Sequence, residues 1–264
     1  MLGAIIGDIV GSPYEFGSDK RKDFPLFRSI SGPTDDSVMT VAVAIQCAHG
    51  HTSDEELFKR GLRYHMRLIG RQYPDAGYGG MFYDWLMSDT DAPYGSYGNG
   101  SAMRVSPVAW IATSLEEAET LAKWSAEVTH DDPRGVRGAQ AVAAAIYLAR
   151  TGKHKDEIRA YIEEHYYMLD FTVDEIRPTY RFDVTCDGSV PQAIVAFLDA
   201  NGFEDAIRNA VSLGGDCDTQ ACITGAIAEA YYGLPDGLWE QTMYYIDESL
   251  QEHIDACSEI IYDA

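Results

Sequence analysis

Two short acidic clusters, Thr34-Asp35-Asp36-Ser37 and Asp216-Cys217-Asp218-Thr219, lie near opposite ends of the chain. Each precedes an apolar stretch with the i, i+3, i+4, i+7 spacing of a buried helical face. Residues one or two positions apart do not share a face inside a helix, so we expect these acids to straddle a helix start. The carboxylates of one cluster can converge there, and the Gly214-Gly215 pair supplies the backbone freedom for the second turn.

Each cluster has two interpretations. Asp, Thr and Ser are the usual helix N-caps, but one cap needs only one side chain. If the two clusters meet in space, four carboxylates repel one another strongly unless cations hold them together. Four negative charges balance two divalent cations, and an all-oxygen ligand set favours Mg²⁺ or Mn²⁺. No EF-hand spacing is present, so a calcium loop is not expected.

Helical periodicity dominates the remainder of the chain and predicts an all-α fold. The expected helices cover residues 37–49, 54–69, 115–128, 135–150, 155–166, 190–200, 203–213, 219–232 and 238–262. The only strand-like alternation, at Tyr180, Phe182 and Val184, is short. The sequence shows no βαβ rhythm, internal repeat or low-complexity linker. We therefore predict a single compact all-α domain over residues 1–264, with its functional loops at helix starts.

The N-terminal segment has glycines at positions 3, 7 and 11, which share one helical face and let a neighbouring helix approach closely. It has no basic region, and Asp8 interrupts its apolar run, so it is not expected to be a signal peptide. No run of 18 apolar residues occurs, and we expect no membrane-spanning segment.

Charge and cysteine content narrow the class of partner and the compartment. The formal net charge is −22, which argues against nucleic acid and anionic membranes because both reward basic surfaces. The five cysteines are odd in number and form no C-x-x-C pair. This pattern is typical of free thiols in a reducing compartment, and we predict a cytoplasmic protein.

A third loop, Tyr94-Gly95-Ser96-Tyr97-Gly98-Asn99-Gly100-Ser101, is rich in residues that tolerate positive φ and leads into the apolar segment 102–112. Such a loop can turn its N–H groups toward a phosphate at a helix start, although a plain Asn-Gly turn is the commoner outcome. It matches neither a Walker loop nor G-x-G-x-x-G, because Met103 stands at the third glycine. Tyr94 and Tyr97 either stack on a base or simply pack.

Two further side chains are candidates. Glu15 follows the first helical segment at a proline turn and is either a mobile metal ligand or a solvated loop acid. His130, in Thr129-His130-Asp131-Asp132, also precedes a helix. A lone histidine is more often structural than catalytic, and it would mix poorly with an oxygen ligand set.

Six motifs occur in a fixed order along the chain. They are Gly7-Asp8 to Glu15, Thr34-Asp35-Asp36-Ser37, Gly98-Asn99-Gly100-Ser101-Ala102-Met103-Arg104, Thr129-His130, Gly188-Ser189-Val190-Pro191 and Gly214-Gly215-Asp216-Cys217-Asp218-Thr219. Together they closely resemble the ADP-ribosylglycohydrolase family, the group that includes the dinitrogenase reductase-activating glycohydrolase. The resemblance runs from near residue 3 to about residue 235.

The resemblance implies a compact orthogonal helical domain with a binuclear Mg²⁺ or Mn²⁺ centre in a cleft. The implied metal ligands are Thr34, Asp35, Asp36, Asp216, Asp218 and Thr219. Glu15 matches a glutamate that moves on and off the metal site. The implied substrate contacts come from the loop residues Tyr97, Gly98, Asn99, Gly100 and Ser101, and from His130. Related bacterial sequences often carry a second histidine where this chain has Asp132, which puts fine substrate contacts in question.

The implied reaction is hydrolysis at C1 of the distal ribose of an ADP-ribose unit attached to a protein or to a small molecule. Asp35, Asp36 or Asp218 would accept the proton of the attacking water, and we favour Asp36. Two other classes remain open: a two-metal phosphohydrolase acting on a nucleotide diphosphate link, and a catalytically silent ADP-ribose-binding protein.

Overall fold

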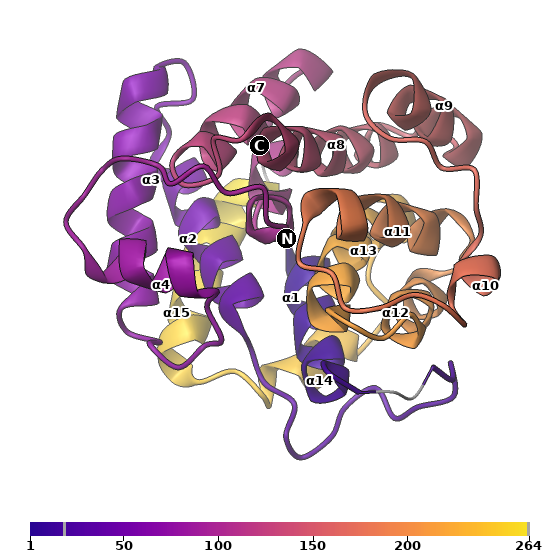
Figure 1. Ribbon diagram of the computed structural model, residues 1–264. Helices are drawn as coiled ribbons and strands as arrows, with labels where there is room; N and C mark the ends of the chain where they lie inside the picture. The colour runs from indigo at the N-terminus through magenta and orange to yellow at the C-terminus, as the bar shows by residue number, and fades with distance from the viewer. Residues whose placement is uncertain (18–19, 263–264) are drawn as a thin grey trace.

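The computed structural model describes residues 1–17 and 20–262, and these residues form helices and loops with no strand (Figure 1). In chain order the elements are α1 (Leu2–Gly11), the 3₁₀ turn η1 (Ser12–Tyr14), α2 (Asp35–His49), α3 (Glu55–Gly70), α4 (Gly80–Met87), α5 (Gly100–Met103), α6 (Ser106–Ile111), α7 (Leu115–Glu127), α8 (Pro133–Arg150), α9 (Lys155–His165), α10 (Val173–Ile176), α11 (Cys186–Leu198), α12 (Phe203–Ser212), α13 (Cys217–Tyr232), α14 (Leu238–Met243) and α15 (Glu248–Tyr262). The all-α prediction is confirmed.

Helix α1 lies at the centre of the molecule, between α2 and α13, and packs most extensively against α13 (Figure 1). All its residues from Gly3 to Gly11 are buried. A Cβ atom added to Gly7 would lie 2.0 Å from the carbonyl oxygen of Ala221, and one added to Gly3 would lie 2.3 Å from that of Gly225. The predicted close helix approach is therefore confirmed, and the partner is the helix that begins at the second acidic cluster.

This packing brings the two ends of the chain together. The starts of α2 and α13 both lie against α1, so the first and second acidic clusters meet although they are far apart in the sequence. Gly214 and Gly215, with φ of 68° and 72°, make the left-handed turn that leads into α13. Only glycine adopts such angles routinely, so these two residues set the direction in which α13 begins.

Most predicted helices are present, but the prediction of one helix over 238–262 is wrong. The chain breaks after α14 and restarts at α15 because Asp247 interrupts the pattern. The Asp247 carboxylate accepts a hydrogen bond from the backbone N–H of Leu250 (3.1 Å), and Gln251 donates to the carbonyl oxygens of Met243 and Ile246. These bonds satisfy backbone groups that a continuous helix would have paired.

Helix α11 begins at Cys186, earlier than the expected start at residue 190, and contains Pro191. The start is fixed by Thr185, whose side chain accepts from the N–H of Gly188. The strand-like alternation at 180–184 forms no strand, and an isolated bridge follows it, between Thr185 and Gly98. There Asn99 N–H donates to the Val184 carbonyl (2.8 Å), so this segment supports the glycine-rich loop.

Buried apolar side chains from α1 to α15 form one continuous cluster around this centre. Within residues 1–17 and 20–262, every helix is too short or too polar to cross a membrane.

The contact between α1 and α13 gives a direct test. Gly7→Ala forces a methyl group into the backbone of α13 and should lower the free energy of unfolding by about 1–3 kcal/mol, the usual cost of overpacking. Urea denaturation measures this change. Gly32→Ala is the matched control, because nothing lies within 4 Å of a Cβ added there. Equal stability of the two variants would contradict the tight approach of α1 to α13.

Candidate functional site

A cleft of about 730 Å³ opens where α2, α4, α5 and α13 begin. Its lining includes Thr34, Asp35 and Asp36 from the first cluster and Asp216, Asp218 and Thr219 from the second. The glycine-rich loop and His130 line it as well. At its edge the rings of Phe16 and Phe182 stack with centroids 5.2 Å apart. The cleft thus brings together predicted site residues from distant parts of the chain, whereas Ser101 is not among the residues that line it.

Among the described residues, two groups of three carboxylates have oxygens close enough to share an ion. Asp8, Asp36 and Asp218 form one group, and Glu15, Asp216 and Asp218 form the other. Within each group the potential ligand atoms lie within 4.8 Å of one another. Because Asp218 belongs to both groups, two cations held there would be neighbours.

Of the two residues at the N-cap positions, Thr34 acts as a helix cap and Asp216 does not. Thr34 is the N-cap of α2, and its side chain accepts from the N–H of Asp36. Asp216 occupies the N-cap position of α13 but makes no capping bond. Its carboxylate instead accepts a hydrogen bond of 2.6 Å from the side-chain amide of Asn99. Asp216, Asp218 and Thr219 of the second cluster therefore line the cleft, and Asp216 is held by the glycine-rich loop instead of capping its own helix.

Asp8, on α1, is a central residue of the site that the sequence analysis did not assign to it. It is fully buried, and its carboxylate accepts from the N–H and hydroxyl of Thr34 (2.9 and 2.7 Å) and from the N–H of Ser37 (3.1 Å). The Ser37 hydroxyl is a further donor. The signal was present, because a charged residue inside a wholly apolar helix requires partners when it is buried.

Burial and mutual repulsion raise the pKa values of these carboxyl groups. Asp36 and Asp218 have pKa values well above the ordinary range, first because burial disfavours the charged form and then because neighbouring carboxylates repel. The same causes raise the pKa of Asp35 to about 8 and that of Glu15 to about 7. The protein alone does not compensate this concentration of negative charge.

The residues fit hard divalent cations. One oxygen of Asp36 and one of Asp218, both named Oδ1, are buried and have no hydrogen-bond partner within the described chain. Thr219 donates to the other oxygen of Asp36 at 3.2 Å and so leaves Oδ1 free. Buried carboxylate oxygens without partners are costly, and an all-oxygen set is the kind that Mg²⁺ and Mn²⁺ prefer.

Asp35 and Glu15 occupy the border of this cluster. Asp35 lines the cleft but belongs to neither carboxylate group of the described residues. Its backbone N–H donates to the Ala76 carbonyl at 2.8 Å, which ties the start of α2 to the segment before α4. Glu15 follows η1 directly and precedes Phe16, whose φ of 62° is rare for a side chain of this size.

The glycine-rich loop is held in place by hydrogen bonds. The Asn99 side chain is buried and donates to Ser189 (3.1 Å) as well as to Asp216. The Ser101 hydroxyl is also buried and donates to the Gly135 carbonyl at 2.8 Å. These two side chains brace the loop, and their predicted contacts with substrate stay predictions. The N–H groups of Gly100 and Ser101 lie in the first turn of α5, where a helix leaves them without internal acceptors.

Gly98 and Gly100 leave room for His130. A Cβ added to Gly100 would lie 3.1 Å from Nε2 of His130, and one added to Gly98 would lie 3.6 Å from the same atom. At the edge of the loop, Arg134 lies over the ring of Tyr97 at 3.7 Å from its centroid. Asp132 caps α8 and pairs with Arg134 at 2.9 Å, so it has a structural role in this chain.

His130 is the end of a buried chain of polar side chains. Its Nδ1 lies 2.8 Å from the hydroxyl oxygen of Thr129, which in turn accepts a hydrogen bond of 2.9 Å from Arg104. Arg104 is fully buried and lines the cleft. Burial and the positive charge of Arg104 hold the pKa of His130 well below its usual value. Arg104 ends the motif that begins at Gly98, and the motif alone does not indicate this role.

Comparison with known proteins decides the family. The sequence model described as ADP-ribosylglycohydrolase matches residues 1–263. The chain belongs to the ADP-ribosylglycohydrolase family. It is 27% identical to ADP-ribosylhydrolase ARH3 of Bos taurus, in an alignment covering 94% of this chain and 88% of that protein. It is also 27% identical to ADP-ribosylarginine hydrolase Tri1 of Pseudomonas putida, covering 89% of this chain and 70% of that protein.

A solved structure described as an ADP-ribosylglycohydrolase-related protein complex has the same fold as this family member. The TM-score is 0.69 at 22% identity, and the alignment covers 99% of this chain and 96% of the other. At this identity the likeness establishes the fold alone.

The raised pKa values predict how stability depends on pH without metal. Between about pH 4, where carboxyl groups of an unfolded chain titrate, and pH 8, the folded state binds more protons than the unfolded state. Stability should therefore fall as the pH rises from 5 to 8 in EDTA. Mg²⁺ or Mn²⁺ should reverse most of the loss, and thermal melting measures both effects.

Asp218→Asn should flatten this pH dependence in EDTA. It removes the Asp218 carboxyl, which belongs to both of the three-residue carboxylate groups. Asp236→Asn, at an exposed position, is the control and should keep the wild-type slope. A melting temperature in EDTA that rises with pH would contradict the charge cluster.

The Arg104–Thr129–His130 chain predicts one tautomer. Because arginine is always a donor, the Thr129 hydroxyl accepts from Arg104 and keeps its own hydrogen for Nδ1 of His130. His130 should be neutral at pH 7, with its proton on Nε2 toward the loop. Nitrogen chemical shifts of labelled histidine distinguish the tautomers. Thr129→Val should change the His130 signals, and a wild-type Nδ1–H signal would refute the assignment.

Proposed function

We propose that this protein is a metal-dependent hydrolase that cleaves the bond between C1 of the distal ribose of ADP-ribose and the side chain or small molecule that carries it. The observation that carries the proposal is the pair of carboxylate groups sharing Asp218 on the floor of a cleft walled by the glycine-rich loop. Family membership supports the ADP-ribosyl substrate class.

Thr34, Asp35, Asp36, Asp216, Asp218 and Thr219 would hold two Mg²⁺ or Mn²⁺ ions, with Glu15 as an additional, movable ligand. When bound, such ions lower the pKa of a water molecule and polarise sugar hydroxyl groups. Asp8 has a different task, because its oxygens already accept hydrogen bonds from Thr34 and Ser37. It orients the ligands of the first cluster.

We propose that Asp36 is the general base, which accepts the proton of the attacking water. Its Oδ1 has no hydrogen-bond partner among the described residues, while Thr219 donates to Oδ2 at 3.2 Å. Asp218 also has a free oxygen, but both carboxylate groups share it, and Asp35 stands outside them. Asp35 and Asp218 are therefore the weaker alternatives for this role.

The surrounding carboxylates also stabilise the reacting sugar. Positive charge develops at C1 as the glycosidic bond breaks, and negative groups placed beforehand in a site with little water favour that charge. A guanidinium leaving group departs without much help from an acid. The N–H groups of Gly100 and Ser101 and the neutral ring of His130 would position the diphosphate and ribose.

We also propose that residues 1–264 form one domain and that the protein is cytoplasmic. One continuous apolar cluster links α1 to α15 across the described residues. The five cysteines are buried and free, as is usual in a reducing compartment.

In the decisive experiment the protein is incubated with arginine-linked or serine-linked ADP-ribosyl peptides in the presence of Mg²⁺, Mn²⁺ or EDTA, and the released products are identified. Metal-dependent release of ADP-ribose supports the glycohydrolase and identifies its linkage. Release of AMP would instead support the two-metal phosphohydrolase. ADP-ribose binding without release from a wider set of adducts would identify a binding protein.

Asp36→Ala and Asp218→Ala should each reduce turnover by at least about a thousandfold, because each removes a group that acts in the transition state. Their helical circular dichroism should stay close to that of the wild type. Asp236→Asn is the control and should keep full activity. Substantial activity in either alanine variant would contradict the binuclear assignment.

A further inference from the structure

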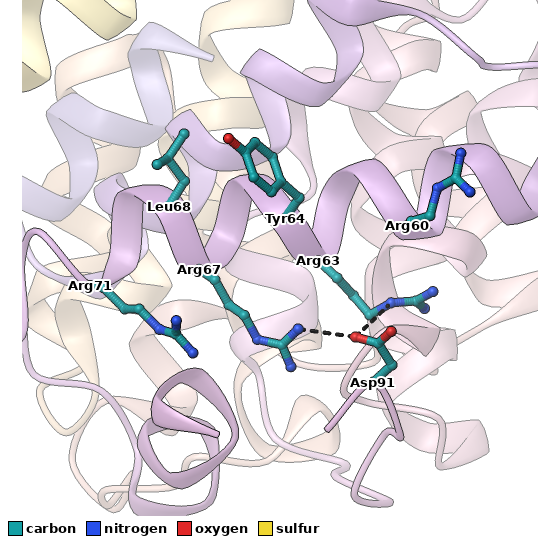
Figure 2. Close-up of a pocket in the computed structure, with 7 residues that line it drawn as sticks. All are labelled: Arg60, Arg63, Tyr64, Arg67, Leu68, Arg71 and Asp91. Atoms are coloured by element: carbon teal, nitrogen blue, oxygen red, sulfur yellow. Dashed lines mark hydrogen bonds and ion pairs between the residues drawn. The ribbon is translucent and has the colours of Figure 1, made fainter. Parts of the chain in front are cut away.

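Four arginines form a row along α3: Arg60, Arg63 and Arg67 lie on the helix, and Arg71 is the residue that caps its C-terminal end (Figure 2). Their spacing of three, four and four residues keeps them on one side of the helix. The chain has only 20 Lys and Arg residues against 42 Asp and Glu. The row is therefore a positively charged strip on a molecule with a large negative net charge.

The row lines a groove of about 490 Å³ together with Tyr64, Leu68 and Asp91. The side chains of Arg63 and Arg67 are only 16% and 15% exposed, so their charges lie in the wall of the groove. Among the described residues the lining has one carboxylate, Asp91, which is 66% exposed, and the fully exposed Asp89 approaches Arg71 at 3.6 Å from outside the lining. The groove has an excess of positive charge.

Two of the arginines have a structural task. Arg71 donates to the carbonyl oxygens of Leu86 and Ser88, each at 2.8 Å. Arg67 donates to Asp91 at 3.0 Å and to the Thr90 carbonyl, and it lies 4.4 Å from the ring centroid of Trp85. These contacts fasten the segment after α4 against α3.

Arg60 takes no part in that fastening among the described residues, and Arg63 takes part only through one long ion pair with Asp91. The Nε of Arg63 is buried and lies 3.5 Å from an Asp91 oxygen, an ion pair too long for a good hydrogen bond. Arg60 makes no hydrogen bond or ion pair within residues 1–17 and 20–262. Figure 2 shows the Arg63 and Arg67 side chains directed toward Asp91, with Arg60 farther along the same helix. Arg60 is exposed and Arg63 is partly buried, and the guanidinium donors that they leave unused favour an anion.

We propose that this groove is a second binding site, for a phosphate-bearing ligand of the nucleoside diphosphate class. A diphosphate concentrates several charges and many acceptor oxygens in one compact group, which suits adjacent guanidinium forks. An acidic peptide spreads single charges along its backbone and matches the groove less well. Tyr64, 61% exposed between Arg60 and Arg67, offers a ring for a base to stack on.

The groove is separate from the cleft. No residue lines both, and the groove lies on α3 while the carboxylate floor lies at the starts of α2 and α13. The segment that follows α3 supplies Ala76 and Gly77 to the cleft wall. The proposal does not depend on the proposed hydrolase activity.

Isothermal titration with ADP in EDTA tests the site. The variant is Arg60→Gln with Arg63→Gln, which leaves Arg67 and Arg71 to hold the segment after α4. The matched control, Lys123→Gln with Lys153→Gln, removes the same charge at two positions whose side chains are 51% and 49% exposed. Thermal melting confirms that both variants are folded.

In the Arg60→Gln/Arg63→Gln variant, affinity at one ADP site should fall by at least about tenfold, with no change in the control. If the cleft also binds ADP, the parent has two sites and the groove variant keeps one. If the cleft fails to bind, the parent has one site and the variant has none. A ten-residue oligothymidylate is titrated in parallel. If it binds the parent and loses affinity in the Arg60→Gln/Arg63→Gln variant, the phosphates that the groove recognises are those of a nucleic acid. Unchanged ADP binding in the variant, no ADP binding by the parent, or binding of an oligoglutamate peptide alone would overturn the proposal.

Discussion

The buried carboxylate of Asp8 is the interaction on which the structure of the site depends. It accepts hydrogen bonds from both ends of the first turn of α2, at Thr34 and Ser37, and so fastens that turn to α1. The glycines of α1 press the same helix against α13. One helix therefore holds the starts of two others, and their acidic clusters face each other. Any anion in such a place must be compensated, first by hydrogen bonds and then by cations.

Much of the fold follows from local pattern, and the exceptions have physical causes. The apolar stripes after residues 37 and 219 predicted α2 and α13, and the glycine spacing predicted the close approach of α1. The prediction over 238–262 failed because the Asp247 side chain competes with the helix backbone for hydrogen bonds. Helix α4, with glycines at its start and a mostly exposed surface, carries too weak a stripe to be found in the sequence.

The location of the site could be predicted from the sequence, but its detailed geometry could not. The residue types and the positions at helix starts indicated that two acidic clusters would converge, and they do. The sequence did not predict which residues make up each carboxylate group. Among the described residues, Asp8 belongs to one group and Asp35 belongs to neither. Those details depend on how three helices pack. Asn99 and Ser101 likewise form supporting bonds with segments that no short motif contains.

The position of α1 has a consequence for biosynthesis. The hydroxyl of Thr219 and the carboxylate of Asp36, which meet at the site, are 183 positions apart in the sequence. At about 5–20 residues per second, a ribosome needs roughly 10 to 40 seconds to make that interval. During this time the glycine face of α1 lacks α13, the helix against which it packs, although Asp8 already has its partners at the start of α2. The site therefore cannot be complete until the last third of the chain has been made.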